Sequence, residues 1–189
     1  MIEMNSYLNS AIQQFEYYKL LGEKTIDQLG KDNWHNKISE ESNSVYVIVK
    51  HLSGNMQSRF ADFLTSDGEK EWRNRDDEFE ESNDLDMMEM WQKGWSVLLN
   101  TLKALYAADL EKIVFIRNEG HTVIEAINRQ LCHYAYHVGQ IVFIGKAILD
   151  KEFKSLSIPK KGSAVYNAEK FAKEKSNKHF TEDEIERLS

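Results

Sequence analysis

Two histidines one helical turn apart, His133 and His137, have the type and spacing that most clearly suggest chemistry. Side chains four residues apart lie on the same face of a helix, so both imidazoles could bind one metal ion. A third histidine, His51, lies in another segment that is expected to be helical. Three histidines with an open fourth position are the ligands of a catalytic metal site, not of a closed structural one. The same spacing also occurs by chance in helices that bind no metal.

The other histidines and the single cysteine are expected to lie outside such a site. His35 and His121 fall in or beside predicted loops and His179 falls in a charged C-terminal segment, so all three are expected to be solvated surface residues. Cys132 precedes His133 but points about 100° away around the helix. We interpret it as a small core residue. One cysteine cannot form an internal disulfide, which fits a reducing cytoplasm.

Composition limits the classes of function. The chain has 189 residues and a net charge of −7, with 41% apolar and 29% charged residues, which is typical of a soluble globular domain. The acidic balance argues against nucleic acid or an anionic membrane as a partner. No apolar run approaches the roughly 20 residues of a membrane span, and no signal peptide is visible. These features predict a cytoplasmic location.

Four helices are expected to position the histidines. Apolar residues recur every three or four positions in segments of about 6–29, 45–64, 83–106 and 123–149. Gly30 can end the first segment, and Thr122 with Glu125 forms a capping box at the start of the fourth. Only one proline, Pro159, occurs in the chain. The pattern predicts an all-α fold, an up-down four-helix bundle over residues 1–165.

Two smaller features accompany the predicted bundle. Residues 112–121 are interpreted as a short β-hairpin before the fourth helix, with its turn at the glycine of Asn118-Glu119-Gly120. Residues 166–189 form a charged C-terminal tail that is expected to be partly helical or disordered. Thr181 and Glu184 have the spacing of a second capping box, which could begin a final short helix.

The sequence as a whole resembles the DinB/YfiT-like superfamily of metal-binding four-helix bundles, and in particular a bacillus-type subfamily without assigned function. The resemblance extends over nearly the whole chain in the order of the family. The stretches that carry it are 43–45, 51–56, 67–70, 73–76, 127–130, 133, 137–141 and 155–159.

The resemblance implies a ligand set and a cofactor. The superfamily has one metal-binding histidine on the second helix and an H-x-x-x-H pair on the fourth, which match His51, His133 and His137. Nickel or zinc is implied, and imidazole suits both. The resemblance also implies a homodimer. Asn55 and Gln140, about one turn from the ligands, are candidates to orient the imidazoles, or else are buried polar groups that bond elsewhere.

Similarity to characterised relatives implies a transferase that uses a low-molecular-weight thiol of the bacillithiol type. The metal would favour the thiolate, which is the competent nucleophile. No catalytic side chain is assigned. Arg73 and Arg75 are candidates to bind anionic groups of the thiol, although they could instead pair with Asp76, Asp77 and Glu78.

Two other functions compete with the thiol transferase. One is a non-enzymatic, stress-related binding or scaffold protein in which the metal is structural or vestigial, and a shell closed by a fourth protein ligand would favour it. The other is nucleic-acid binding, against which the acidic charge and the absence of a basic stripe both argue.

Overall fold

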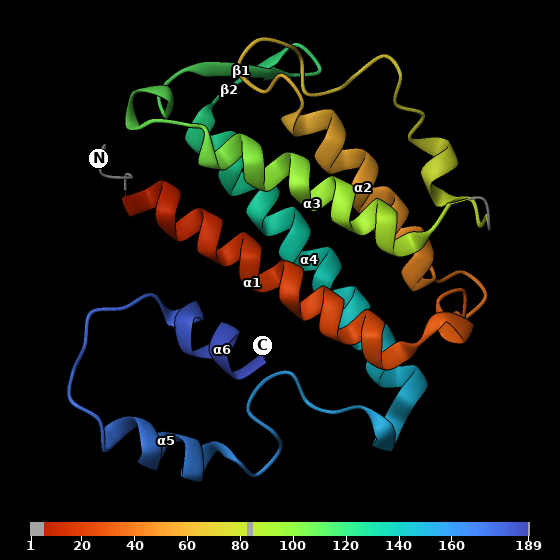
Figure 1. Ribbon diagram of the computed structural model, residues 1–189. Helices are drawn as coiled ribbons and strands as arrows, with labels where there is room; N and C mark the ends of the chain where they lie inside the picture. The colour runs from red at the N-terminus through yellow and green to blue at the C-terminus, as the bar shows by residue number, and fades with distance from the viewer. Residues whose placement is uncertain (1–5, 83–84, 189) are drawn as a thin grey trace.

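Four long helices are the largest elements of the computed structural model, which describes residues 6–82 and 85–188 (Figure 1). They are α1 (Ser6–Leu29), α2 (Val45–Phe60), α3 (Met87–Lys103) and α4 (Val123–Leu149). Two short helices follow, α5 (Ser163–Phe171) and α6 (Phe180–Leu188). A hairpin of β1 (Ile113–Ile116) and β2 (Glu119–Thr122) precedes α4. The structure is therefore mostly helical and has a hairpin before α4, as the sequence predicted.

Local capping explains where the helices begin. At α4 the predicted box forms, because Thr122 Oγ1 accepts from the Glu125 amide at 3.1 Å and Glu125 accepts from the Thr122 amide at 2.8 Å. Helix α3 starts later than predicted because Asp86 Oδ1 accepts from the amides of Met88 and Glu89. The predicted start at Asn83 lies outside the described residues. Helix α2 ends at Phe60 rather than at residue 64, and α3 ends at Lys103 rather than at residue 106.

The path of the chain differs from a simple up-down bundle, because α2 and α3 run in the same direction (Figure 1). Hydrogen bonds between these two regions advance in step along both helices. They join Tyr46 to Leu85, Ser53 to Met90 and Thr101 to Phe60. Residues 61–82 therefore return along the length of α2, about 24 Å for the 16 residues of that helix. The up-down prediction was wrong because the chain between α2 and α3 forms this crossover.

Helices α1 and α4 are also parallel to each other. The Tyr7 hydroxyl donates to the Ile124 carbonyl near the start of both helices, and the Gln28 amide group donates to the Lys154 carbonyl near their ends. Helix α1 packs on α3 and α4, and α2 packs on α3 and α4. Trp91 and Trp95 lie in the core between them, at most 1% exposed, as their spacing indicated. None of the described helices has the length and apolarity needed to cross a membrane.

The hairpin turns two residues earlier than the sequence suggested. Ile116 pairs with Glu119, so the turn is formed by Arg117 and Asn118, with φ of +56° and +62°. Two consecutive positive φ values are those of a type I′ turn, the commonest hairpin connection. Gly120 instead lies in β2, opposite Phe115. The sequence favoured the glycine as the turn residue because an arginine at positive φ is uncommon without support from another part of the chain.

Asp67 supplies that support from the crossover. Its carboxylate accepts from the backbone amides of Arg117, Asn118 and Glu69 at 2.7–2.9 Å. Burial alone would raise the pKa of Asp67, but these three donors hold the pKa below its ordinary value. The carboxylate therefore ties the crossover to the hairpin.

Asp67→Ala is expected to lower the free energy of unfolding at pH 7 by about 1 kcal/mol, because hydrogen bonds to a charged but partly exposed group are lost. A depressed pKa in the folded state stabilises the protein above the unfolded pKa, near 4, and that contribution is lost as pH falls through the folded pKa. The difference between wild type and variant in urea denaturation should therefore shrink below about pH 4. A difference that is constant from pH 7 to pH 3 would contradict this assignment.

Helix α6, near the C-terminal end, packs on α1. His179 Nε2 lies 3.0 Å from Ser10 Oγ, so His179 is a docking residue rather than a solvated one. The predicted Thr181–Glu184 capping box does not form. Glu184 accepts from the Tyr166 hydroxyl instead, and Glu182 accepts from the His179 amide. Thr181 is buried, because packing on α1 decides its environment rather than local capping.

Candidate metal centre

The three predicted ligands converge on one point between α2 and α4. His133 Nε2 lies 3.1 Å from His137 Nε2 and 3.5 Å from His51 Nε2. Possible ligand atoms of the three residues all lie within 4.8 Å of one another. Helices α2 and α4 are antiparallel neighbours, and successive turns of α4 carry His133 and His137 to the same place. These three histidines could hold a metal ion.

In two of the rings, Nδ1 forms a hydrogen bond to a neighbouring side chain, which leaves Nε2 available to bind a metal. His51 Nδ1 donates to Glu78 Oε2 at 2.9 Å, and His137 Nδ1 donates to Gln140 Oε1 at 2.7 Å. A proton on Nδ1 leaves a lone pair on Nε2, which faces the other rings. Partners of this kind fix the tautomer and orientation of metal-binding histidines. The donor set therefore fits a divalent ion.

Gln140 occupies the position that the sequence suggested, whereas Asn55 does not contact a ligand ring. Asn55 Oδ1 accepts from the Tyr134 hydroxyl at 2.9 Å. Among hydrogen bonds of the described residues, none joins Asn55 to an imidazole. Asn55 thus matches the alternative of a buried polar group that bonds elsewhere.

Replacing Gln140 with leucine is expected to weaken zinc binding by about 10- to 100-fold, because His137 loses the acceptor that orients it. Isothermal titration of the metal-free protein measures this effect. Gln14→Leu on α1, remote from the site, provides the control. Equal affinities for the two variants would show that Gln140 does not position His137.

Glu78 reaches His51 from the crossover and is the most important residue that the sequence did not assign to this site. It lies in a short 3-10 helix, Asp76–Phe79, and is buried. Arg73 binds both of its oxygens, at 2.7 and 2.8 Å. Burial would raise the pKa of Glu78, but the bonds from His51 and Arg73 lower it below its ordinary value. Glu78 is therefore an anion that accepts from His51.

A glycine on α2 makes room for this carboxylate. A Cβ atom built at Gly54 would overlap Glu78, with Glu78 Cδ only 2.9 Å away. Gly54 thus allows the crossover to approach the helix closely enough for Glu78 to bond to His51. Nothing local in the sequence signals this requirement, because the two residues are 24 positions apart.

Burial favours the neutral form of two of the imidazoles, those of His133 and His137. It lowers the pKa of His133 to about 3, with smaller contributions from His137, His51 and the nearby arginines. Burial also lowers the pKa of His137, and only the bond to Gln140 opposes that shift. Neutral imidazole is the form that binds metals, so both rings have the required protonation state at neutral pH.

A cavity of about 470 Å³ opens over the three rings. Side chains from α2, α4, the crossover and the hairpin turn line it: His51, Asn55, Arg59, Arg73, Arg75, Phe79, Arg117, Arg129, Gln130, His133, Tyr136 and His137. None of these described residues is acidic. Glu78 contacts His51 but does not line this cavity. The three-histidine group contains no fourth ligand from the described part of the chain. Space for a small molecule therefore adjoins the open side of the site.

The two predicted arginines have different environments. Arg73 is 2% exposed at its side chain and binds Glu78 and Glu69, which matches the alternative of pairing with acidic neighbours. Arg75 lies over the Phe79 ring at 5.3 Å and lines the cavity. The sequence did not single out Arg59, Arg117 or Arg129, because the residues that bring them together are far apart along the chain.

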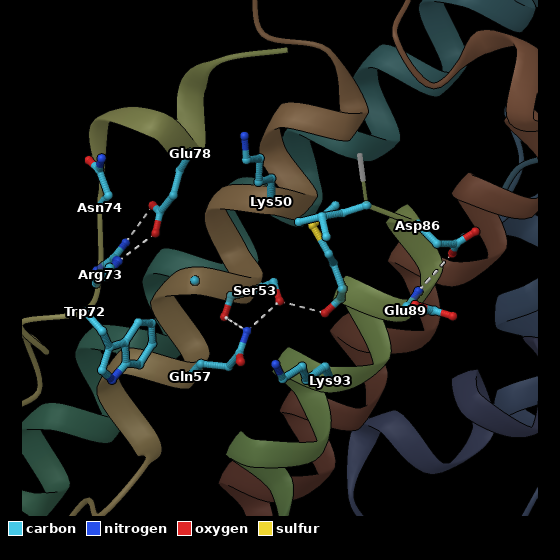
Figure 2. A pocket seen from close by; sticks show the side chains of 13 residues that line it. Lys50, Ser53, Gln57, Trp72, Arg73, Asn74, Glu78, Asp86, Glu89 and Lys93 are labelled. Carbon is cyan, nitrogen blue, oxygen red and sulfur yellow. Dashed lines mark hydrogen bonds and ion pairs between the residues drawn. The ribbon is translucent and has the colours of Figure 1, made fainter. Parts of the chain in front are cut away.

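A second cavity, of about 350 Å³, follows the face of α2 that is turned toward α3. Figure 2 shows the Arg73–Glu78 pair at one side of it and Lys93 of α3 toward the other, with Ser53 and Gln57 of α2 between them. Arg73 lines both cavities, so the pair forms a wall between them.

The surroundings of Cys132 differ from the core position that was expected. Cys132 is exposed on α4, as is Tyr136 one turn further along. The face of α4 that carries His133 turns toward α2, and its neighbour in sequence consequently points outward.

A family model described as a protein of unknown function, DUF1572, matches residues 3–162. No curated protein and no solved structure matches the chain. The matched segment contains all three histidines, Glu78 and all five arginines of the cavity. The chain therefore belongs to the DUF1572 family of proteins of unknown function.

Proposed function

We propose that this protein is a DinB-like metalloprotein that binds one divalent ion through His51, His133 and His137. The supporting observation is that three imidazole Nε2 atoms face one another at the base of a cavity, two of them held in the metal-binding tautomer. The packing of α1 to α4 suits a four-helix bundle with one long crossover between α2 and α3. Ligands on facing helices are the usual construction of bundle metal sites.

We further propose that the protein transfers a low-molecular-weight thiol of the bacillithiol type to an electrophile. When bound, a zinc or nickel ion would supply Lewis acidity that favours the thiolate. The sulfur would form a bond to an electrophilic carbon, the leaving group would depart with its electron pair, and the thiol proton would pass to solvent. Within this chain, Glu78 and Gln140 hold His51 and His137 in orientation, and Phe79 and Tyr136 supply aromatic walls of the cavity.

The test begins with the purified protein and its metal content. Zinc- or nickel-loaded protein is then mixed with bacillithiol or glutathione and a chromogenic electrophile, with metal-free protein as the control. Thiol-dependent turnover that requires the metal supports the transferase. Tight metal binding without turnover for any thiol would favour the non-enzymatic alternative. A protein that binds neither zinc nor nickel would overturn both. The homodimer stays a prediction, which analytical ultracentrifugation of the same sample tests.

A further inference from the structure

The cavity over the histidines is strongly basic, although the chain carries a net charge of −7. Five arginines from three parts of the chain line it: Arg59, Arg73, Arg75, Arg117 and Arg129. Two carboxylates, Glu69 and Glu78, pair with these guanidinium groups, and a third, Asp67, interacts with Arg59 and with the backbone amide of Arg117. Two positive charges are therefore left in excess before any metal is added. Excess charge of one sign in a cleft attracts ligands of the opposite sign.

The five arginines fall into an inner pair and an outer three. Arg59 and Arg73 are buried and paired, Arg59 with Glu69 and Arg73 with both carboxylates. They are part of the support of the site.

The outer three arginines, Arg75, Arg117 and Arg129, are exposed and weakly compensated. Arg75 contacts the Phe79 ring, and Arg129 Nη1 donates to His121 Nε2 at 3.5 Å. Arg117 is 58% exposed at its side chain and shares Glu69 with the inner pair. These guanidinium groups have donors left for a ligand.

Arg117 has a backbone conformation that costs free energy, and contacts with another part of the chain maintain it. Its φ of +56° is uncommon for a residue with a side chain, and Asp67 holds it there through two amide hydrogen bonds. The consequence of this turn is that one more guanidinium group lies at the cavity.

We propose that the cavity binds a small molecule by two ends. A carboxylate or phosphate group of the molecule is bound by Arg75, Arg117 and Arg129, and its other end lies against the three imidazoles. Guanidinium forks suit both kinds of anion. The inference rests on the proposed function only for the end that meets the metal, because the arginines are present with or without an ion.

The first experiment uses cobalt-loaded protein, in which thiolate binding gives an absorption band. Mercaptosuccinate, a thiol with two carboxylates, is compared with neutral 2-mercaptoethanol. We expect mercaptosuccinate to bind at least about tenfold more tightly, since each charge-assisted contact contributes roughly that factor. The double variant Arg75→Gln/Arg129→Gln should remove the preference and leave cobalt affinity unchanged. Lys37→Gln, an exposed cation outside the cavity, is the matched control and should preserve the preference.

A second experiment separates this inference from the metal. Succinate and inorganic phosphate are titrated into metal-free protein by calorimetry, and the tighter of the two identifies the anion that the site prefers. We expect the double variant to weaken that binding by about tenfold or more, and added salt to weaken it in the wild type. Failure to bind cobalt would contradict the proposed function but leave this test intact. Equal binding of the two thiols, or anion binding that ignores the arginine substitutions, would overturn the two-ended ligand.

Discussion

Replacing His133 with alanine is expected to lower the affinity for zinc or nickel by at least about 100-fold. Loss of a side chain that orients a metal ligand already costs about 10- to 100-fold in affinity, and His133 is itself one of the three proposed ligands. Its Nε2 atom lies within 3.5 Å of the Nε2 atoms of both other histidines, so no remaining side chain of the group can take its position. Titration of metal-free protein with competing chelators measures the change.

The fold should survive this substitution. Burial lowers the pKa of His133 to about 3, so the ring is neutral at pH 7 and its removal leaves no unpaired buried charge. His35→Ala, a histidine outside the cavity that pairs with Glu81, is the control and should bind metal normally. If the two variants bind zinc with the same affinity, the three histidines are not the site.

Gly54→Ala is expected to destabilise the protein by about 1–3 kcal/mol, in the range for overpacked positions. The added methyl group overlaps the Glu78 carboxylate, so the crossover must move away from α2. Glu78 would then lose its contact with His51, and the affinity for metal should be about 10- to 100-fold lower than in the wild type. Urea denaturation and zinc titration of the same variant measure the two effects.

Gly139→Ala provides the matched control, because it makes the same change within a helix where nothing lies within 4 Å of the new Cβ. Alanine is a better helix former than glycine by about 1 kcal/mol, so this variant should be more stable than the wild type. Opposite signs for the two substitutions would confirm that contact with Glu78, rather than helix propensity, decides the result at Gly54. A stabilising Gly54→Ala would mean that Glu78 is not held against α2.

The sequence was most informative where the physics is local. Apolar spacing placed α1 and α4 at their observed bounds, and the Thr122–Glu125 box marked the start of α4, because both depend on neighbouring residues. Spacing within one helix also put His133 and His137 on one face. Local patterns failed at the hairpin turn and at Thr181, where Asp67 and the packing against α1 impose the outcome from a distance.

Amino-acid type and spacing by themselves determined the helical class, the histidine pair, and, with the family resemblance, the choice of His51 as third ligand. Only the tertiary structure decided the path of the crossover and what it brings to the site. It makes α2 and α3 parallel, carries Glu78 across Gly54 to His51, and joins Arg73 and Arg75 to arginines from α2, α4 and the hairpin. The reason is physical: a contact between residues far apart in the chain depends on how whole helices pack, and no short sequence pattern encodes that packing.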